Sequence, residues 1–248
     1  MTGLRLAVSW LTVLPLRGPE QVDRSIAARA IAWAPVVGVL LGGGAAGLLW
    51  GLGQLGAAWL LAGFVVVAGL GLIARGMHID GLADTMDGLG SYGSPERARE
   101  IMKSGGAGPF GVAALVFALA IQAVSLGALA EAGRWLAVVV AVAVGRVAVV
   151  LACRRGIEAA PGAGFGALVA GAQPPVTGYA WGVIACLAAV FATSHPWQGP
   201  LAVLLALAAA TVLVRHCVRR FGGLNGDVLG AALELSVTIA AAVLSFAR

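Results

Sequence analysis

Residues 134–153 read RWLAVVVAVAVGRVAVVLAC, an apolar run with a single internal charge, Arg146. A helix needs about 20 such residues to cross the roughly 30 Å hydrocarbon core of a bilayer. Similar runs recur along the whole chain, of which 60% is hydrophobic and only 11% charged. Soluble domains carry about a quarter charged residues. The sequence therefore predicts an all-α, polytopic transmembrane helical bundle.

The apolar runs predict about seven membrane spans, separated by polar connectors too short to form a soluble domain. We therefore expect residues 1–248 to form one integral membrane catalytic domain. The segment Leu4–Leu16 is also hydrophobic, but it is short and lacks a small-residue cleavage site. This segment predicts a short interfacial or re-entrant helix and not a cleaved signal peptide. The expected spans are about 31–51, 54–75, 108–130, 134–153, 176–193, 199–214 and 224–247.

Lysine and arginine give an independent test of the topology, because cytoplasmic loops are enriched in both residues. With seven spans, 13 of the 16 basic residues fall on one side, Arg134 and Arg248 fall on the other, and Arg146 lies inside a span. This asymmetry predicts a cytoplasmic N-terminus in a bacterial or archaeal cytoplasmic (inner) membrane. It also explains the net charge of +5 as a topology signal, without a nucleic-acid partner. The 13 residues are Arg5, Arg17, Arg24, Arg29, Arg75, Arg97, Arg99, Lys103, Arg154, Arg155, Arg215, Arg219 and Arg220.

Two other residue types have structural interpretations. Cys153, Cys186 and Cys217 lie in or beside apolar segments without metal-binding spacing, which disfavours both a disulfide framework and a zinc site. The glycines at 42–44 and the pattern Gly47xxxGly51 favour close helix packing over a phosphate cradle.

The acidic residues are unusually concentrated. Three of the five aspartates, Asp80, Asp84 and Asp87, lie in the segment MHIDGLADTMDG at 77–88. On a helix this spacing places the three carboxylates within an arc of about 60°. Their mutual repulsion calls for a cation, and carboxylate oxygens suit Mg²⁺ or Mn²⁺. His78 projects from the opposite face and is a secondary candidate. A solvated loop neutralised by nearby basic residues is the structural alternative.

A second acidic pair, Asp227 and Glu234, lies two turns apart in GGLNGDVLGAALE at 222–234. We expect Asp227 at the membrane level of the aspartate triplet and Glu234 deeper. Arg146 needs a buried carboxylate or a substrate phosphate as its partner, and its planar guanidinium suits either. A helix cap at Asp227 and a Glu234–Arg146 pair would be purely structural roles.

Several segments together resemble the cobalamin synthase family, the adenosylcobinamide-GDP ribazoletransferases. The most specific are HIDGLADTMDG at 78–88 and GGLNGDVLGA at 222–231, and REIMK at 99–103, GPFG at 108–111, Gly145-Arg146 and GFG at 164–166 follow the family order. Two positions differ from the family pattern. The loop at 104–107 lacks an acidic residue, and Asn225 stands where the family often has threonine.

The resemblance implies a Mg²⁺-dependent reaction in which α-ribazole, or its 5′-phosphate, attacks adenosylcobinamide-GDP and releases GMP. Asp80, Asp84 and Asp87 would hold the metal, and Asp84, Asp87 or Asp227 would accept the proton of the attacking hydroxyl. The active site would face the cytoplasm, and a homo-oligomer is compatible with the sequence. The candidate substrate-binding residues are Arg75, His78, Lys103, Arg146, Asn225 and Glu234.

Two other functions are alternatives to this one. Asp84xxAsp87Gly88 matches the opening of the CDP-alcohol phosphotransferase motif, but the later aspartates of that motif are absent. A transporter could use Asp227, Glu234 and Arg146 as a polar path, but transporter sites usually lie near the middle of the membrane. Most carboxylates here are expected at one end of the spans.

Overall fold

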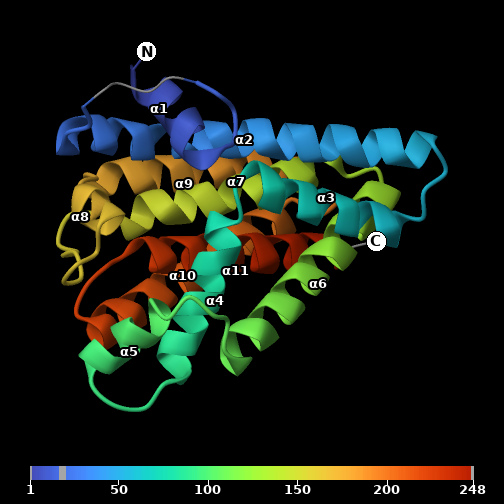
Figure 1. Ribbon diagram of the computed structural model, residues 1–248. Coiled ribbons are helices and arrows are strands. Elements are labelled where there is room, and N and C mark those ends of the chain that lie inside the picture. Colours follow the sequence, from blue (N-terminus) through green and yellow to red (C-terminus); the bar gives the residue numbers. More distant parts are fainter. Residues whose placement is uncertain (1, 17–20, 247–248) are drawn as a thin grey trace.

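The computed structural model describes residues 2–16 and 21–246, and this part of the chain is built from α-helices without strands, apart from two isolated β-bridges (Figure 1). Arg17 and Arg248, both used in the charge count, lie outside the described residues. The helices are α1 (Thr2–Leu11), α2 (Arg24–Gln54), α3 (Trp59–Ile73), α4 (Met77–Gly90), α5 (Pro95–Met102), α6 (Pro109–Glu131), α7 (Trp135–Ala152), α8 (Phe165–Val169), α9 (Pro175–Val190), α10 (Gln198–Phe221) and α11 (Gly226–Ser245).

Five of these helices, α2, α6, α7, α10 and α11, are long and apolar enough to cross a membrane. This confirms the prediction of an all-α polytopic membrane protein. The expected spans at 54–75 and 176–193 are helices too, but α3 has only 15 residues and α9 only 16. The count reaches six if α3 and α4 form one broken span. The seven-span count and the cytoplasmic N-terminus therefore stay predictions.

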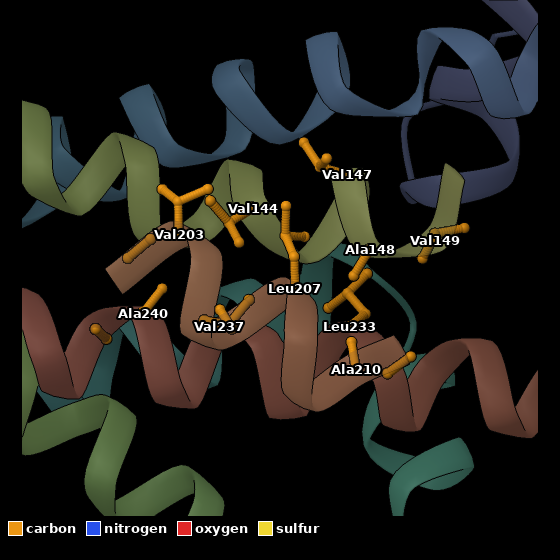
Figure 2. Close-up of a cluster of buried hydrophobic side chains, with 14 of the residues drawn as sticks. Val144, Val147, Ala148, Val149, Val203, Leu207, Ala210, Leu233, Val237 and Ala240 are labelled. Atoms are coloured by element: carbon orange, nitrogen blue, oxygen red, sulfur yellow. The ribbon is translucent and has the colours of Figure 1, made fainter. Parts of the chain in front are cut away.

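The opening stretch forms α7 (Figure 1), and this helix is the most buried of the five long ones. Its valines and alanines pack against α10 and α11, where Val144, Leu207 and Leu233 belong to one apolar cluster (Figure 2). On its other side, α7 contacts α2 closely at two glycines. A Cβ atom at Gly42 would lie 2.8 Å from Val139 Cα, so only glycine allows this approach. This contact confirms the packing role predicted for Gly42.

The prediction was wrong for Gly43, Gly44, Gly47 and Gly51. Within the described residues, a Cβ atom at any of these positions would meet nothing within 4 Å. Gly47 lies on the exposed face of α2 and Gly51 is half-buried, whereas Leu49 between them is buried. Cys153, Cys186 and Cys217 are all free, and Cys153 and Cys217 are buried.

The acidic helix α4 turns sharply away from α3. Arg75 has φ +57° and Gly76 has φ +70°, and this left-handed backbone ends α3 and restarts the chain as α4 at 92° to it (Figure 1). Left-handed φ values cannot continue a right-handed helix. As a result, α4 lies across α11 and α6, and does not continue the line of α3.

The N-terminal segment contains the predicted short helix. Leu6 and Ala7 of α1 are buried against Ala30, Val37 and other apolar side chains of α2. The interfacial position of α1 stays a prediction, but its packing places the end of α1 near the turn between α3 and α4. There Val13 N–H donates to the Ile73 carbonyl at 2.7 Å.

Candidate active site

The aspartate triplet lies on a regular helix. The solvated-loop alternative is wrong, because Asp80, Asp84 and Asp87 all belong to α4. Close packing against α11 brings this helix to Asp227. A Cβ atom at Gly81 would lie 2.8 Å from the Asp227 carbonyl oxygen, and the contact therefore requires glycine.

Asp84 occupies the centre of an acidic cluster. Its half-buried carboxylate feels the negative charges of Asp80, Asp227 and Asp87, in that order of strength. Partial burial and three like charges all disfavour the ionised form of a carboxylate. A bound cation would offset both effects. Within the described residues, no hydrogen bond engages the side chain of Asp80 or of Asp84, so both remain free to act as ligands.

Asp87 differs from its neighbours because its carboxylate is already engaged. One oxygen accepts from Gly108 N–H at 2.6 Å and the other from Gly111 N–H at 2.9 Å, at the start of α6. Negative charge is favourable at a helix N-terminus, where backbone N–H groups lack intrahelical partners. This geometry gives Asp87 an anchoring role. Its predicted roles as metal ligand and base remain untested.

A cavity of about 470 Å³ opens beside the acidic cluster. Asp80 and Asp227 lie on its wall, together with Trp10 from α1 and Phe165 from α8. Arg75 also lines it, but one terminal nitrogen of Arg75 donates to the carbonyls of Ser9 and Thr12 and so caps the end of α1. Most of the remaining wall is apolar, contributed by Leu11, Ile31, Met77, Val149 and Leu229.

A second cavity, of about 190 Å³, adjoins the first and has a basic wall. Lys103, Arg99 and Asp227 line it. Asn225 caps α11 by accepting from Val228 N–H at 3.0 Å, and its amide nitrogen donates to Asp227 at 3.1 Å. Phe165, Gly226 and Asp227 line both cavities, and Asp227 therefore lies where they meet.

Backbone contacts hold these walls together. Leu224 N–H donates to the Glu158 carbonyl at 2.8 Å, and Ala160 N–H donates to the Leu224 carbonyl at 2.9 Å. At Gly166, a Cβ atom would lie 2.8 Å from the Leu224 carbonyl oxygen, so glycine allows α8 to pack on the loop before α11. This packing sets the position of Phe165 beside Asp227.

The donor set can be tested for a magnesium ion. In the described part of the chain, no three Asp, Glu, His or Cys side chains converge closely enough to hold a metal ion by themselves. However, Mg²⁺ commonly takes one or two protein carboxylates and completes its shell with water and substrate phosphates. Asp80 lines the larger cavity, and the free carboxylates of Asp80 and Asp84 both lie near Asp227, where the two cavities meet. They fit such a partial site.

Arg146 and Glu234 lie elsewhere, around a small buried cavity of about 20 Å³. Glu234 accepts from Gln122 at 2.8 Å, and Arg146 donates to the Val142 carbonyl at 3.1 Å. His78 lines both this cavity and the large one. Within the described residues, Arg146 and Glu234 form no ion pair within 4 Å, and Arg146 Nε has no hydrogen-bond partner, so their pairing and their substrate binding both stay predictions.

Three residues at the site were not predicted from the sequence: Trp10, Phe165 and Arg99. The rings of Trp10 and Phe165 meet edge to face, with centroids 4.9 Å apart. The segment GFG at 164–166 was the available signal for Phe165. Trp10 could not have been paired with it, because 155 residues separate the two rings in the chain.

Comparison with known proteins identifies the family. The family model for cobalamin-5-phosphate synthase matches residues 3–245. The adenosylcobinamide-GDP ribazoletransferase of Corynebacterium efficiens is 40% identical over 96% of this chain and 89% of its own length. Those of Frankia casuarinae and Pseudomonas fluorescens (strain Pf0-1) are 37% and 34% identical, over 100% and 95% of this chain and 95% of their own lengths in both cases. No solved structure gives a significant match. An acidic helix packed on α11 beside two cavities is thus the candidate active site of a membrane enzyme that belongs to the cobalamin-5-phosphate synthase family.

Proposed function

We propose that this chain transfers the adenosylcobinamide phosphate group from adenosylcobinamide-GDP to α-ribazole or its 5′-phosphate, releasing GMP and forming adenosylcobalamin or its 5′-phosphate. One observation carries the proposal: in a chain of this family, Asp227 lines both a basic and an apolar cavity, and Asp80 lines the apolar one, next to the carboxylate of Asp84. Phosphoryl transfer needs positioned phosphates, charge neutralisation and an oriented nucleophile.

In the proposed step, a ribose hydroxyl oxygen of the acceptor bonds to the phosphorus that carries the cobinamide. The bond from this phosphorus to the oxygen shared with GMP breaks, and its electron pair leaves with GMP. The hydroxyl proton passes to the Asp227 carboxylate. Asp227 is preferred over Asp84 and Asp87 as the base because it lies where the two cavities meet. The ammonium group of Lys103, near Asp227, would bind the negatively charged phosphate oxygens.

Asp80 and Asp84 would hold a magnesium ion against the pyrophosphate. When bound, the ion would neutralise charge on the phosphate oxygens and improve GMP as a leaving group. The active site would face the cytoplasm of a bacterial or archaeal inner membrane, where both substrates are soluble. This orientation follows the asymmetry of the basic residues.

The test uses the full chain purified in detergent. With adenosylcobinamide-GDP, α-ribazole and Mg²⁺, the protein should form a cobalamin and release GMP. Asp84→Asn should lower the rate of GMP release at least a thousandfold while the protein still inserts and folds. Glu100→Gln, which alters an exposed carboxylate on the neighbouring helix α5, is the matched control and should keep full activity.

Full activity of Asp84→Asn would eliminate the acidic cluster as the site. A panel with CDP-linked alcohols checks the rival chemistry. Turnover with these compounds, and none with the corrinoid, would overturn the proposed reaction.

A further inference from the structure

The larger cavity has a composition that the proposed reaction alone does not explain. It is mostly apolar, yet it lies directly against Asp80 and Asp227. Its volume of about 470 Å³ is in the range of small-molecule sites. Trp10 and Phe165 form an aromatic corner, and the Phe165 side chain keeps 40% exposure even though it packs on Trp10. An aromatic ring that is packed on one side and open on the other is suited to stacking.

The two substrates place different demands on a cavity. The donor carries a charged pyrophosphate, a hydrogen-bonding guanine and a corrin ring that is far too large for this space. The acceptor is a nucleoside whose base, a dimethyl-substituted benzimidazole, is flat and almost entirely apolar. Guanine would leave several polar edge atoms unpaired against the apolar wall, which is costly. The cavity therefore matches the acceptor base better than any part of the donor.

The position of Asp227 supports the same assignment. It lies on the wall shared by the apolar cavity and the basic one, which contains Lys103 and Arg99. A nucleoside with its base in the apolar cavity would hold its ribose toward this wall. The donor phosphates would then approach from the basic side. The reacting hydroxyl and the phosphorus would thus meet at Asp227.

We infer that Trp10, Phe165 and the apolar wall of the larger cavity form the acceptor subsite, which selects a nucleoside with a flat apolar base and orients its ribose toward Asp227. This inference rests on the proposed function and deepens it. It also gives α1 a role in substrate binding, because this N-terminal helix supplies one of the two rings.

The experiment measures the KM of each substrate separately in the full-length enzyme, together with direct binding of α-ribazole by equilibrium dialysis. Removing a stacking ring should weaken acceptor binding by about tenfold or more. Phe165→Ala and Trp10→Ala should raise the KM and Kd for α-ribazole by that factor and leave the KM for adenosylcobinamide-GDP unchanged. Lys103→Ala should show the opposite pattern.

Further variants separate stacking from folding. Phe165→Leu and Trp10→Leu keep an apolar side chain but remove the aromatic ring, and both should still raise the KM for α-ribazole. Phe165→Tyr and Trp10→Phe keep an aromatic ring and should bring this KM back close to the wild-type value. Phe191→Ala, at an exposed ring on the end of α9, is the matched control and should change neither KM.

The outcomes distinguish this inference from the proposed function. If the wild-type protein makes no cobalamin, the proposed function fails, and the subsite with it. If the wild type is active but the ring variants leave both KM values unchanged, only the subsite is overturned. A rise in the donor KM alone would assign the cavity to guanine or corrin and would equally overturn it.

Discussion

Asp87 and Asp84 are three residues apart on one helix, yet their carboxylates have different surroundings. Asp87 accepts backbone N–H groups at both oxygens, whereas Asp84 accepts none within the described residues. At the residue scale, the triplet therefore divides into an anchor and free carboxylates. Charge spacing in the sequence could not distinguish them, because the partners of Asp87 come from α6.

This difference predicts separate effects on stability and activity. Asp87→Asn should lower the free energy of unfolding by about 2 kcal/mol, because an amide can accept at one atom only and its NH₂ group would face an N–H donor. Asp80→Asn is the matched control. It should leave stability nearly unchanged, since it removes no hydrogen bond and relieves repulsion with Asp84.

Denaturant unfolding in detergent, followed by circular dichroism, measures both variants. Equal stability of the two would show that the contacts of Asp87 with Gly108 and Gly111 do not anchor α6.

At the element scale, the site depends on how closely α4 approaches α11. Gly81 meets the backbone of Asp227, and Gly230 of α11 meets the backbone of His78 in the same way. These two glycines set the distance between the free carboxylates of α4 and the Asp227 side chain. The glycines in segments 78–88 and 222–231 thus allow close packing, and this packing brings the acidic residues of the two helices together.

Adding a methyl group at Gly81 tests the contact between α4 and α11. Gly81→Ala should push α4 away from α11, lower activity at least tenfold and lower the free energy of unfolding by about 1–3 kcal/mol. Gly43→Ala on α2 is the control, because the added Cβ would meet open space and alanine favours helix by up to about 1 kcal/mol. Activity assays and unfolding of the two variants give the comparison. Wild-type activity of Gly81→Ala would refute the role of this contact.

The helices follow from the sequence because apolar runs of spanning length have few other stable structures in a bilayer. All seven predicted spans are helices; five agree with the expected bounds within five residues, whereas α2 begins seven residues earlier and α10 ends seven residues later than expected. The bend at Arg75 was missed, since a left-handed φ at a non-glycine residue has no signature in hydropathy. The acidic face of α4 was predictable because its residues are neighbours on one helix. The Trp10–Phe165 corner and the anchoring of Asp87 were not, because they depend on contacts between distant segments.

At the scale of the whole molecule, the site lies at one end of the bundle. The acidic helix α4, the short helices α5 and α8 and the start of α11 gather there, while α11 ends at the opposite side (Figure 1). Basic residues lie at the same end: Arg99 and Lys103 line the second cavity, and Arg220 in the last turn of α10 donates to the Ser91 carbonyl at the end of α4. If these residues mark the cytoplasm, the substrates reach the enzyme without crossing the membrane.

Cysteine labelling checks this orientation across α6. Glu100 on α5, shortly before α6, and Glu131 at the end of α6 are both exposed acidic residues. In a background in which Cys153, Cys186 and Cys217 are replaced by alanine, Glu100→Cys should react with a membrane-impermeant maleimide only in inside-out vesicles. Glu131→Cys should react only in right-side-out vesicles. The reverse pattern would place the active site outside the cell, and labelling of both residues from one side would show that α6 does not span the membrane.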